Sequence, residues 1–110
     1  MSNTINQACI DACNKCAQAC YECFDACLSE PDVNARINCI KQLVECAKMC
    51  EMSASLMSFN SGSMKDHCNL CAVICDKCAN ECEMFTDEHC KKCAQFCRIC
   101  ADECRKMAGA

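Results

Sequence analysis

Nineteen of the 110 residues are cysteine, and most recur at alternating intervals of three and four residues. This spacing places side chains on one face of an α-helix, the face that forms the core of a helical bundle. Leucine and isoleucine usually fill that face, whereas here thiols fill it, so we expect the interior of the fold to carry the chemistry. The nineteen thiols belong to Cys9, Cys13, Cys16, Cys20, Cys23, Cys27, Cys39, Cys46, Cys50, Cys68, Cys71, Cys75, Cys78, Cys82, Cys90, Cys93, Cys97, Cys100 and Cys104.

Disulfide bonds do not suit this pattern. A bridge needs Cβ atoms about 3.5 to 4.5 Å apart, whereas helix positions i and i+4 hold them about 5 to 6 Å apart. Nineteen is also an odd number, and the opening MSNT shows no basic region followed by an apolar run that would indicate a secretory signal. We therefore expect a cytoplasmic protein whose thiols stay reduced.

Soft-metal binding explains the spacing better than simple packing does. A buried free cysteine behaves as a small hydrophobe. A core of nineteen cysteines, however, has less side-chain volume than one of leucines, and packing alone offers no benefit that would offset this loss. Pairs such as Cys13/Cys16 and Cys46/Cys50 set two sulfur atoms on one helix face, one turn apart. Such a pair can hold a linearly coordinated ion, and pairs that continue end to end let each thiolate bridge two ions.

Charge balance favours Cu(I) among the soft metals. Thiolates select Cu(I), Zn(II) or iron–sulfur clusters, but each zinc tetrathiolate would carry two net negative charges into the core. The iron–sulfur spacing C-x-x-C-x-x-C with a following proline is absent from the chain. Thiolates that each bridge two digonal Cu(I) ions approach one ion per thiolate, which is nearly neutral, and burying net charge is costly. We therefore expect many Cu(I) ions per chain.

Two other functions stay open at this point. A zinc- or cadmium-sequestering protein of the metallothionein type would use the same thiols. A thiol–disulfide redox protein would use C-x-x-C pairs at exposed helix starts, with one thiol of lowered pKa. Only Cys68/Cys71 and Cys90/Cys93 lie near expected helix starts, so this redox alternative is the weaker one.

The rest of the chain predicts the helices that would position these thiols. Helices are expected over about residues 4–28, 32–58, 63–85 and 87–107, separated by Pro31, by the loop NSGS at residues 60–63 and by a turn near Thr86. Ser63 with Asp66 resembles a capping arrangement, Thr86 or Asp87 is expected to cap the last helix, and Gly109 is expected just beyond it.

Short connections make consecutive helices antiparallel. The sequence therefore predicts an all-α, up-down-up-down antiparallel four-helix bundle with a cysteine-lined core, formed as one domain by residues 1–110. Leu43, Ser53 and Met57 fill the core positions of the second helix where cysteine is missing. A stripe one residue beyond the thiols is expected to pack the helices together, and it comprises Ile10, Ala17, Phe24, Ile40, Ala47, Ala54, Ala72, Ala79, Ala94 and Ala101.

Composition excludes two classes of partner. A net charge of -4 and a pI near 5.1 leave no basic stripe for nucleic acid. The eleven Lys and Arg residues alternate with acids and are expected on solvated helix faces. The longest apolar stretch, residues 70–75, is too short to span a membrane.

The chain resembles the bacterial four-helix copper storage proteins, specifically their cytosolic branch without a targeting peptide. The resemblance covers nearly all of the chain. It is carried by residues 8–13 (ACIDAC), by the sparse second helix with Cys39, Cys46 and Cys50, and by His89-Cys90 at the start of the last helix. It implies a homotetramer of bundles, Cu(I) along each bundle interior and no enzymatic turnover.

The resemblance also implies that ions enter at one end of the bundle, where histidine or methionine supplements the thiols. His89 precedes Cys90 at the end shared with the first loop, and we expect it to be a metal ligand there. His67 precedes Cys68 at the opposite end and is expected to be solvated. The seven methionines are interpreted as packing residues, with Met57 in the core.

Overall fold

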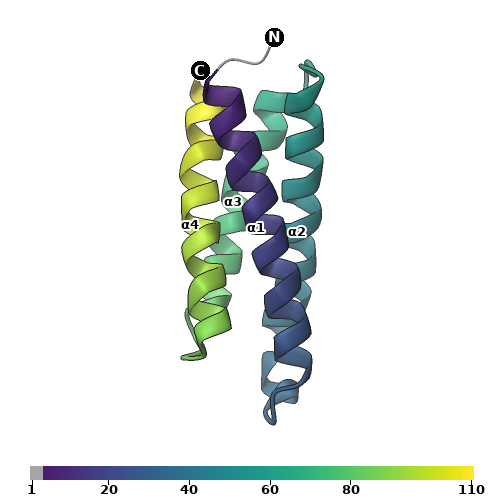
Figure 1. The fold of residues 1–110 in the computed structure, drawn as a ribbon, viewed down its shortest axis with the longest axis vertical. Helices are drawn as coiled ribbons and strands as arrows, with labels where there is room; N and C mark the ends of the chain where they lie inside the picture. The colour runs from purple at the N-terminus through teal and green to yellow at the C-terminus, as the bar shows by residue number, and fades with distance from the viewer. Residues whose placement is uncertain (1–3) are drawn as a thin grey trace.

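The three-and-four spacing of the cysteines builds four long helices that lie side by side (Figure 1). The computed structural model describes residues 4–110, and their side chains from residue 6 onward. The helices are α1 (Thr4–Leu28), α2 (Ile37–Ser58), α3 (Met64–Cys82) and α4 (Glu88–Gly109), with a short 3₁₀ helix, η1 (Val33–Arg36), before α2. No strand occurs in this described part of the chain. The predicted all-α fold is therefore confirmed.

Short connections determine the topology of the bundle. α1 packs against α2 and α4, and α3 packs against the same two helices. Consecutive helices run antiparallel, and the bundle measures 47 × 17 × 17 Å. The α1–α2 and α3–α4 connections lie at one end, while the start of α1 and the end of α4 lie at the other (Figure 1). The predicted up-down-up-down arrangement is confirmed.

At one end of the bundle, two helix ends differ from the sequence prediction because the connections there are packed against other residues. α2 begins at Ile37 rather than Asp32, since η1 intervenes and Arg36 Nε donates to Asp32 Oδ1 at 2.7 Å. α3 ends at Cys82 rather than near Phe85. The ring of Phe85 instead packs against the Arg36 guanidinium, with 4.4 Å between the guanidinium carbon and the ring centroid.

The predicted helix caps are wrong in their hydrogen bonding. Ser63 stands at the N-cap of α3 and Asp87 at the N-cap of α4, but neither side chain bonds a helix N–H group. The Asp87 carboxylate accepts a 2.7 Å bond from Arg36 Nη2 instead. α4 also continues through Gly109, which was expected to lie beyond the helix.

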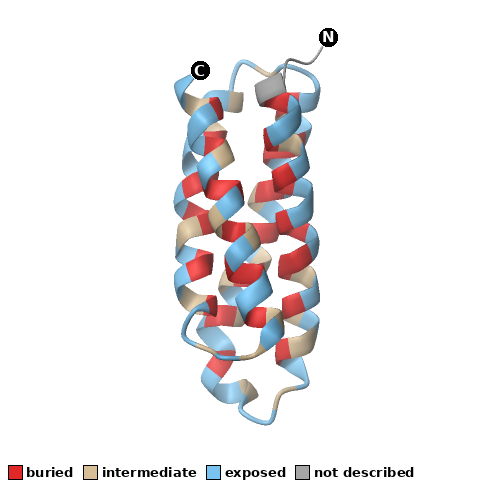
Figure 2. Cartoon of the chain, turned by 60° about the vertical axis from the view of Figure 1, so that its left-hand side comes forward, coloured by how far each residue is buried: buried red, intermediate tan, exposed pale blue. Residues whose placement is uncertain are grey.

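The core consists of thiols and small side chains, and Figure 2 shows the buried positions on the inward faces of the helices. Every cysteine is buried, with at most 1% of its surface exposed. Leu43, Ser53 and Met57 are buried at the α2 positions where cysteine is missing, as the sequence predicts. The stripe is likewise confirmed as packing, since its alanines are buried and Ile10, Phe24 and Ile40 pack against the core.

The outer surface carries ion pairs that join neighbouring helices. Arg98 on α4 bonds Asp76 of α3 at 3.0 Å and Glu83 at 2.8 Å, and Arg105 bonds Asp76 at 2.7 Å. Exposed pairs of this kind contribute little stability individually, but together they fix how α4 lies along α3. Among the described helices, none is apolar enough over sufficient length to cross a membrane.

Burial disfavours the ionised form of the thiols in the metal-free core. Burial first, and repulsion from the neighbouring Cys27 thiolate second, raises the pKa of Cys90 from its ordinary 9.0 to about 12. Hydrogen bonding with Cys16 and other thiols, together with burial, raises the pKa of Cys20 as well. A protonated thiol is apolar enough to pack in a core.

We therefore expect the reduced, metal-free protein to be a folded helical bundle at neutral pH. Far-UV circular dichroism of the thiol-reduced protein in the presence of a strong Cu(I) chelator should show an α-helical spectrum with a cooperative thermal transition. A flat spectrum would mean that metal drives folding, as in metallothioneins.

We also expect the metal-free bundle to lose stability as pH rises from about 9 toward 12. An unfolded thiol ionises near 9.0 while Cys90 in the fold holds its proton to about 12, so the folded state binds more protons and the free energy of unfolding falls. Each thiol that ionises only on unfolding costs up to about 1.4 kcal/mol per pH unit in this window. Urea unfolding at pH 7, 9 and 10 under argon measures the effect, and a midpoint independent of pH would contradict it.

Candidate metal centre

The antiparallel helices arrange the thiols as two ladders that line the bundle axis. Along the first ladder, each step of three or four residues on α1 is matched by an equal step back along α4. The Sγ–Sγ distances of its rungs are 3.7 Å for Cys9–Cys104, 3.6 Å for Cys13–Cys100, 3.7 Å for Cys16–Cys97, 3.7 Å for Cys20–Cys93 and 3.8 Å for Cys23–Cys90.

The second ladder joins α2 to α3 in the same way but has gaps. Its rungs are Cys39–Cys82 at 3.9 Å, Cys46–Cys75 at 3.7 Å and Cys50–Cys71 at 3.9 Å. The register of these rungs places Leu43 opposite Cys78, and Ser53 opposite Cys68. The sparse cysteines of α2 therefore leave two positions of this ladder with a single thiol.

Contacts between the ladders join all the thiols into one structure, here called the sulfur tube and formed by the nineteen cysteine side chains. Cys46 Sγ lies 3.9 Å from Cys16 Sγ and 4.0 Å from Cys97 Sγ, and Cys50 Sγ lies 3.8 Å from Cys100 Sγ. Pairs four residues apart on one helix also meet, as for Cys71 and Cys75 at 3.9 Å. The sequence pattern indicates such pairs within a helix, whereas most of the contacts of 3.6–4.0 Å run between helices.

The sulfur tube contains overlapping groups of four possible ligands. Within each group the ligand atoms lie within 4.8 Å of one another, and five such groups are Cys13/Cys71/Cys100/Cys104, Cys16/Cys46/Cys50/Cys75, Cys16/Cys20/Cys46/Cys97, Cys20/Cys78/Cys93/Cys97 and Cys23/Cys27/His89/Cys90. The three middle groups share members, since Cys16 and Cys46 belong to two of them, as do Cys20 and Cys97. A thiol of this tube is therefore placed to bridge ions.

These distances discriminate between modes of metal binding. A Zn–S bond of about 2.3 Å puts the corners of a zinc tetrahedron about 3.8 Å apart, so one group alone could hold one zinc ion. Adjacent groups cannot all be filled as separate tetrathiolates, because they share sulfur atoms. Filling the whole tube requires bridging thiolates and a metal of low coordination number, which Cu(I) satisfies.

The structure brings His89 into the ligand group at the end where the two interhelix connections lie. Its Nδ1 atom is 3.4 Å from Cys23 Sγ and 3.6 Å from Cys90 Sγ, and its Nε2 atom is 3.4 Å from a carboxylate oxygen of Glu30. Metal-binding histidines characteristically have the outer ring nitrogen held by a carboxylate, which fixes the ring orientation. The geometry of His89 is thus that of a ligand directed into the sulfur tube.

The sequence analysis expects His67, at the opposite end, to be solvated, but the structure shows it only partly exposed. The side chain is half-buried, and its Nδ1 atom lies 2.8 Å from the Ser53 hydroxyl oxygen. Ser53 is one of the two residues that leave a gap in the second ladder. Its hydrogen bond to His67 explains how a serine can be buried there. His67 therefore completes the packing of this end.

Sequence reasoning missed Arg36. It was expected on a solvated face, but only 4% of it is exposed, and its Nη1 atom lies 3.7 Å from Cys27 Sγ and 3.6 Å from Cys90 Sγ. The spacing contains a signal for this placement. Arg36 precedes Cys39 by three residues, so it continues the three-and-four alternation of α2 by one step toward the bundle end.

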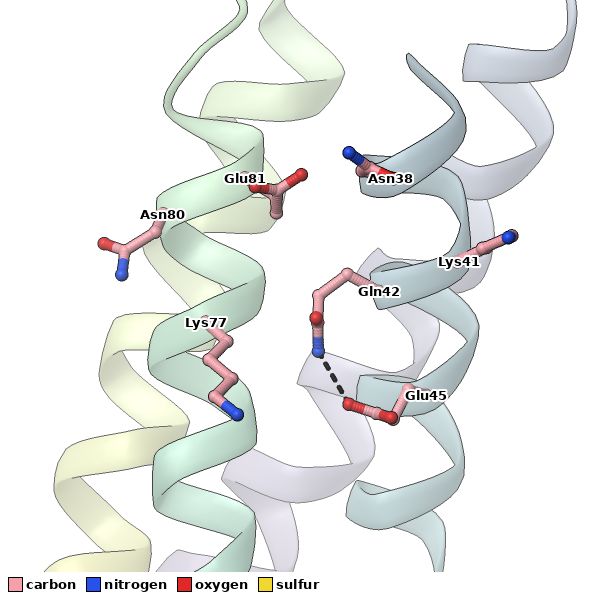
Figure 3. Close-up of a pocket in the computed structure, with 7 residues that line it drawn as sticks. All are labelled: Asn38, Lys41, Gln42, Glu45, Lys77, Asn80 and Glu81. Atoms are coloured by element: carbon pink, nitrogen blue, oxygen red, sulfur yellow. Dashed lines mark hydrogen bonds between the residues drawn. The ribbon is translucent and has the colours of Figure 1, made fainter.

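A surface groove between α2 and α3 lies outside the sulfur tube (Figure 3). It has a volume of about 490 Å³, and its lining is formed by Asn38, Lys41, Gln42, Glu45, Lys77, Asn80 and Glu81. Gln42 Nε2 donates to Glu45 Oε1 at 2.9 Å across its wall. No thiol lines this groove, and the cysteines lie buried in the interior of the bundle rather than in this cleft.

Comparisons with known proteins agree with this site. No curated protein sequence matches the chain. Among solved structures, metal-free copper storage protein 3 from Bacillus subtilis is 41% identical over 93% of this chain and 97% of that chain, with a TM-score of 0.86. Its Cu(I)-bound form is 42% identical over 96% and 99% of the two chains, with a TM-score of 0.90. A cytosolic copper storage protein from Streptomyces lividans, with five coppers, is 36% identical over 96% and 93%, with a TM-score of 0.93.

The family model of the copper storage proteins matches residues 2–109. That match spans both ladders of the sulfur tube and all four helices of the bundle. The sequence prediction of the family is confirmed, and the chain belongs to the copper storage protein family.

Proposed function

We propose that this protein stores Cu(I), with many ions held along the sulfur tube by its nineteen cysteine thiolates and with His89 as a further ligand at one end. The observation that carries the proposal is the overlap of the four-ligand groups. Isolated sites would not share sulfur atoms, whereas a continuous store requires that they do. The Cu(I)-bound relative from Bacillus subtilis supports the choice of metal.

Charge balance determines how the tube can fill. The ligand is the thiolate, so each incoming Cu(I) displaces about one thiol proton. A +1 ion then replaces a +1 proton, and the interior stays close to neutral at every stage of loading. Because net charge is costly to bury, this one-for-one exchange lets the core that folds without metal also accommodate it.

Burial of the thiols argues against the redox alternative. Thiol–disulfide exchange needs an exposed sulfur atom for the attacking partner. Cys68/Cys71 and Cys90/Cys93, the pairs nearest to helix starts, are at most 1% exposed. We therefore propose binding and release of copper without enzymatic turnover, for storage and for removal of harmful free copper.

Location and assembly follow the same proposal. The reduced thiols suit the cytoplasm, and the Streptomyces lividans relative is described as cytosolic. We propose a homotetramer, as the family resemblance implies. Exposed apolar side chains, including Leu70 and Val73 on α3 and Ile99 on α4, supply surface that such an assembly could bury.

Titration of the reduced protein tests the storage function. We expect Cu(I) to load to about one ion per cysteine, with release of about one proton per ion. Zn(II) should saturate at about four or five ions per chain, as required by four ligands each. Anaerobic titrations against a competing chelator, with proton release followed by a pH indicator, measure both quantities. Cu(I) saturation at the zinc value would support isolated tetrathiolate sites, including a zinc or cadmium protein of the metallothionein type.

His89 should control the rate of copper movement more than the amount held. Its Nδ1 atom faces two thiols of the group Cys23/Cys27/His89/Cys90, here called the outermost group. The imidazole can therefore accept an ion and transfer it to Cys90. In His89→Ala the capacity should fall by about one ion at most, while stopped-flow uptake and chelator removal should change several-fold.

The matched control is His67→Ala at the opposite end. This substitution removes the hydrogen bond to Ser53 and no contact to the outermost group, so copper kinetics should stay as in the unmodified protein. Altered kinetics in His67→Ala combined with unchanged kinetics in His89→Ala would place copper movement at the other end of the bundle.

A further inference from the structure

Arg36 is the buried cation of the His89 end of the bundle. Its side chain is 5% exposed, and its Nε and Nη2 atoms bond Asp32 and Asp87 at 2.7 Å each. The Phe85 ring covers one face of the guanidinium. Arginine is seldom buried unless it is paired, and these contacts explain how the fold accommodates it. They do not explain why its remaining nitrogen atom faces the thiols.

That nitrogen atom lies against two thiols of the ligand group at this end of the tube. Nη1 lies 3.7 Å from Cys27 Sγ and 3.6 Å from Cys90 Sγ. Both sulfur atoms belong to the group Cys23/Cys27/His89/Cys90, whose ligand atoms all lie within 4.8 Å of one another. The guanidinium directs its N–H groups at the sulfur lone pairs that would bind Cu(I). It also places a positive charge within a few ångströms of the ion, where like charges repel strongly.

The surroundings offer the guanidinium a second position. Asp32 and Glu30, which lie toward solvent, have side chains 50% and 30% exposed, and Glu30 is already 3.9 Å from Nη2. Arg36 itself lies at the junction of η1 and α2, outside regular α-helix. Rotation of the guanidinium toward Glu30, with the existing bond to Asp32 retained, would keep its charge paired while it leaves the sulfur atoms.

The partner that the guanidinium would leave behind also has an alternative. Asp87 is at the N-cap of α4 with extended backbone angles (φ -64°, ψ 146°), which are those of a capping residue. Its carboxylate makes no cap bond while it holds Arg36. Once released, it can accept a hydrogen bond from the first turn of α4, where a negative charge is favoured.

We propose that Arg36 is a latch that closes the His89 end of the sulfur tube in the metal-free protein. When Cu(I) occupies the outermost group, Arg36 keeps its bond to Asp32 and swings toward Glu30. This inference rests on the proposed storage function and specifies how the His89 end of the sulfur tube opens. A contact made in only one state shifts the equilibrium away from the other state. The latch therefore stabilises the metal-free form alone, which slows uptake and leaves release unaffected.

Uptake and release kinetics separate this latch from a merely structural role. Arg36→Gln removes the charge without adding a soft ligand, and we expect Cu(I) uptake to become about tenfold faster while removal by a chelator keeps its rate. Final capacity should be unchanged. Fraying of the bundle end would accelerate both processes, so acceleration of both, or of neither, would overturn the latch.

Two further variants control for charge and for loss of an arginine. Arg36→Lys keeps the charge with fewer donors, so its uptake rate should fall between those of the unmodified protein and Arg36→Gln. Arg98→Gln removes an arginine of α4 that contacts Asp76 and Glu83 on the surface, and its uptake rate should not change. Equal acceleration in Arg98→Gln would attribute the effect to general loosening and overturn the latch.

A nuclear magnetic resonance measurement on the unmodified protein tests the movement directly. The chain contains three arginines, Arg36, Arg98 and Arg105, so ¹⁵N-arginine labelling gives a simple spectrum with two internal references. We expect separate, slowly exchanging Nη signals for Arg36 without metal, and averaged, rapidly exchanging signals after Cu(I) loading. Arg98 and Arg105 should not change.

The outcomes distinguish the latch from the storage function. A protein that loads with Cu(I) while the Arg36 signals stay protected would overturn the latch and leave storage intact. A protein that takes up no Cu(I) in the same sample would overturn both.

Discussion

Close approach of the helices is the constraint on which the sulfur tube depends. A thiol side chain is short, so sulfur atoms from neighbouring helices meet at 3.6–4.0 Å only if the backbones pack tightly. The alanine stripe provides that approach, since Ala47, Ala79 and Ala101 are completely buried beside the thiols. Larger residues at these three alanine positions would separate the rungs of both ladders. The residues that bind no metal thus set the geometry of those that can.

A second constraint is the cost of charge in this interior. The polar or charged side chains buried in the described residues are Asn6, Arg36 and Ser53, and Arg36 lies at one end of the tube. The middle of the tube therefore has no fixed cation to offset thiolates. Protons fill that role in the metal-free protein, and monovalent copper can replace them one for one. The same reasoning disfavours a row of zinc tetrathiolates, each of which would leave two negative charges unbalanced.

The cysteine spacing predicted the helices and their buried face, because a three-and-four alternation has one structural interpretation over such lengths. The short connections predicted the antiparallel order. It could not predict which thiols meet across helices, since that register depends on the connections. Leu43 and Ser53 are recognisable as core residues in the sequence, yet their places opposite Cys78 and Cys68 appear only in the fold.

The failures of sequence reasoning concentrate where tertiary contacts override local rules. Asp87 has the sequence context of a helix cap, but the buried guanidinium of Arg36 takes its carboxylate. His67 was interpreted as solvated because a lone histidine at a helix end usually is, whereas Ser53 bonds it from another helix. Arg36 obeys the spacing of the core and violates its chemistry. Such a residue is found by extending the three-and-four spacing of α2 backward from Cys39, its first cysteine.

The two ends of the bundle differ in what they leave accessible. The start of α1 and the end of α4 lie together at the His67 end (Figure 1), far from Arg36 and His89 along the 47 Å axis. A fusion partner or a surface tether attached after Ala110 would therefore lie far from the His89 end of the sulfur tube. Immobilised in this orientation, a layer of these bundles would present to the solution the His89 ends, where we propose that copper is exchanged.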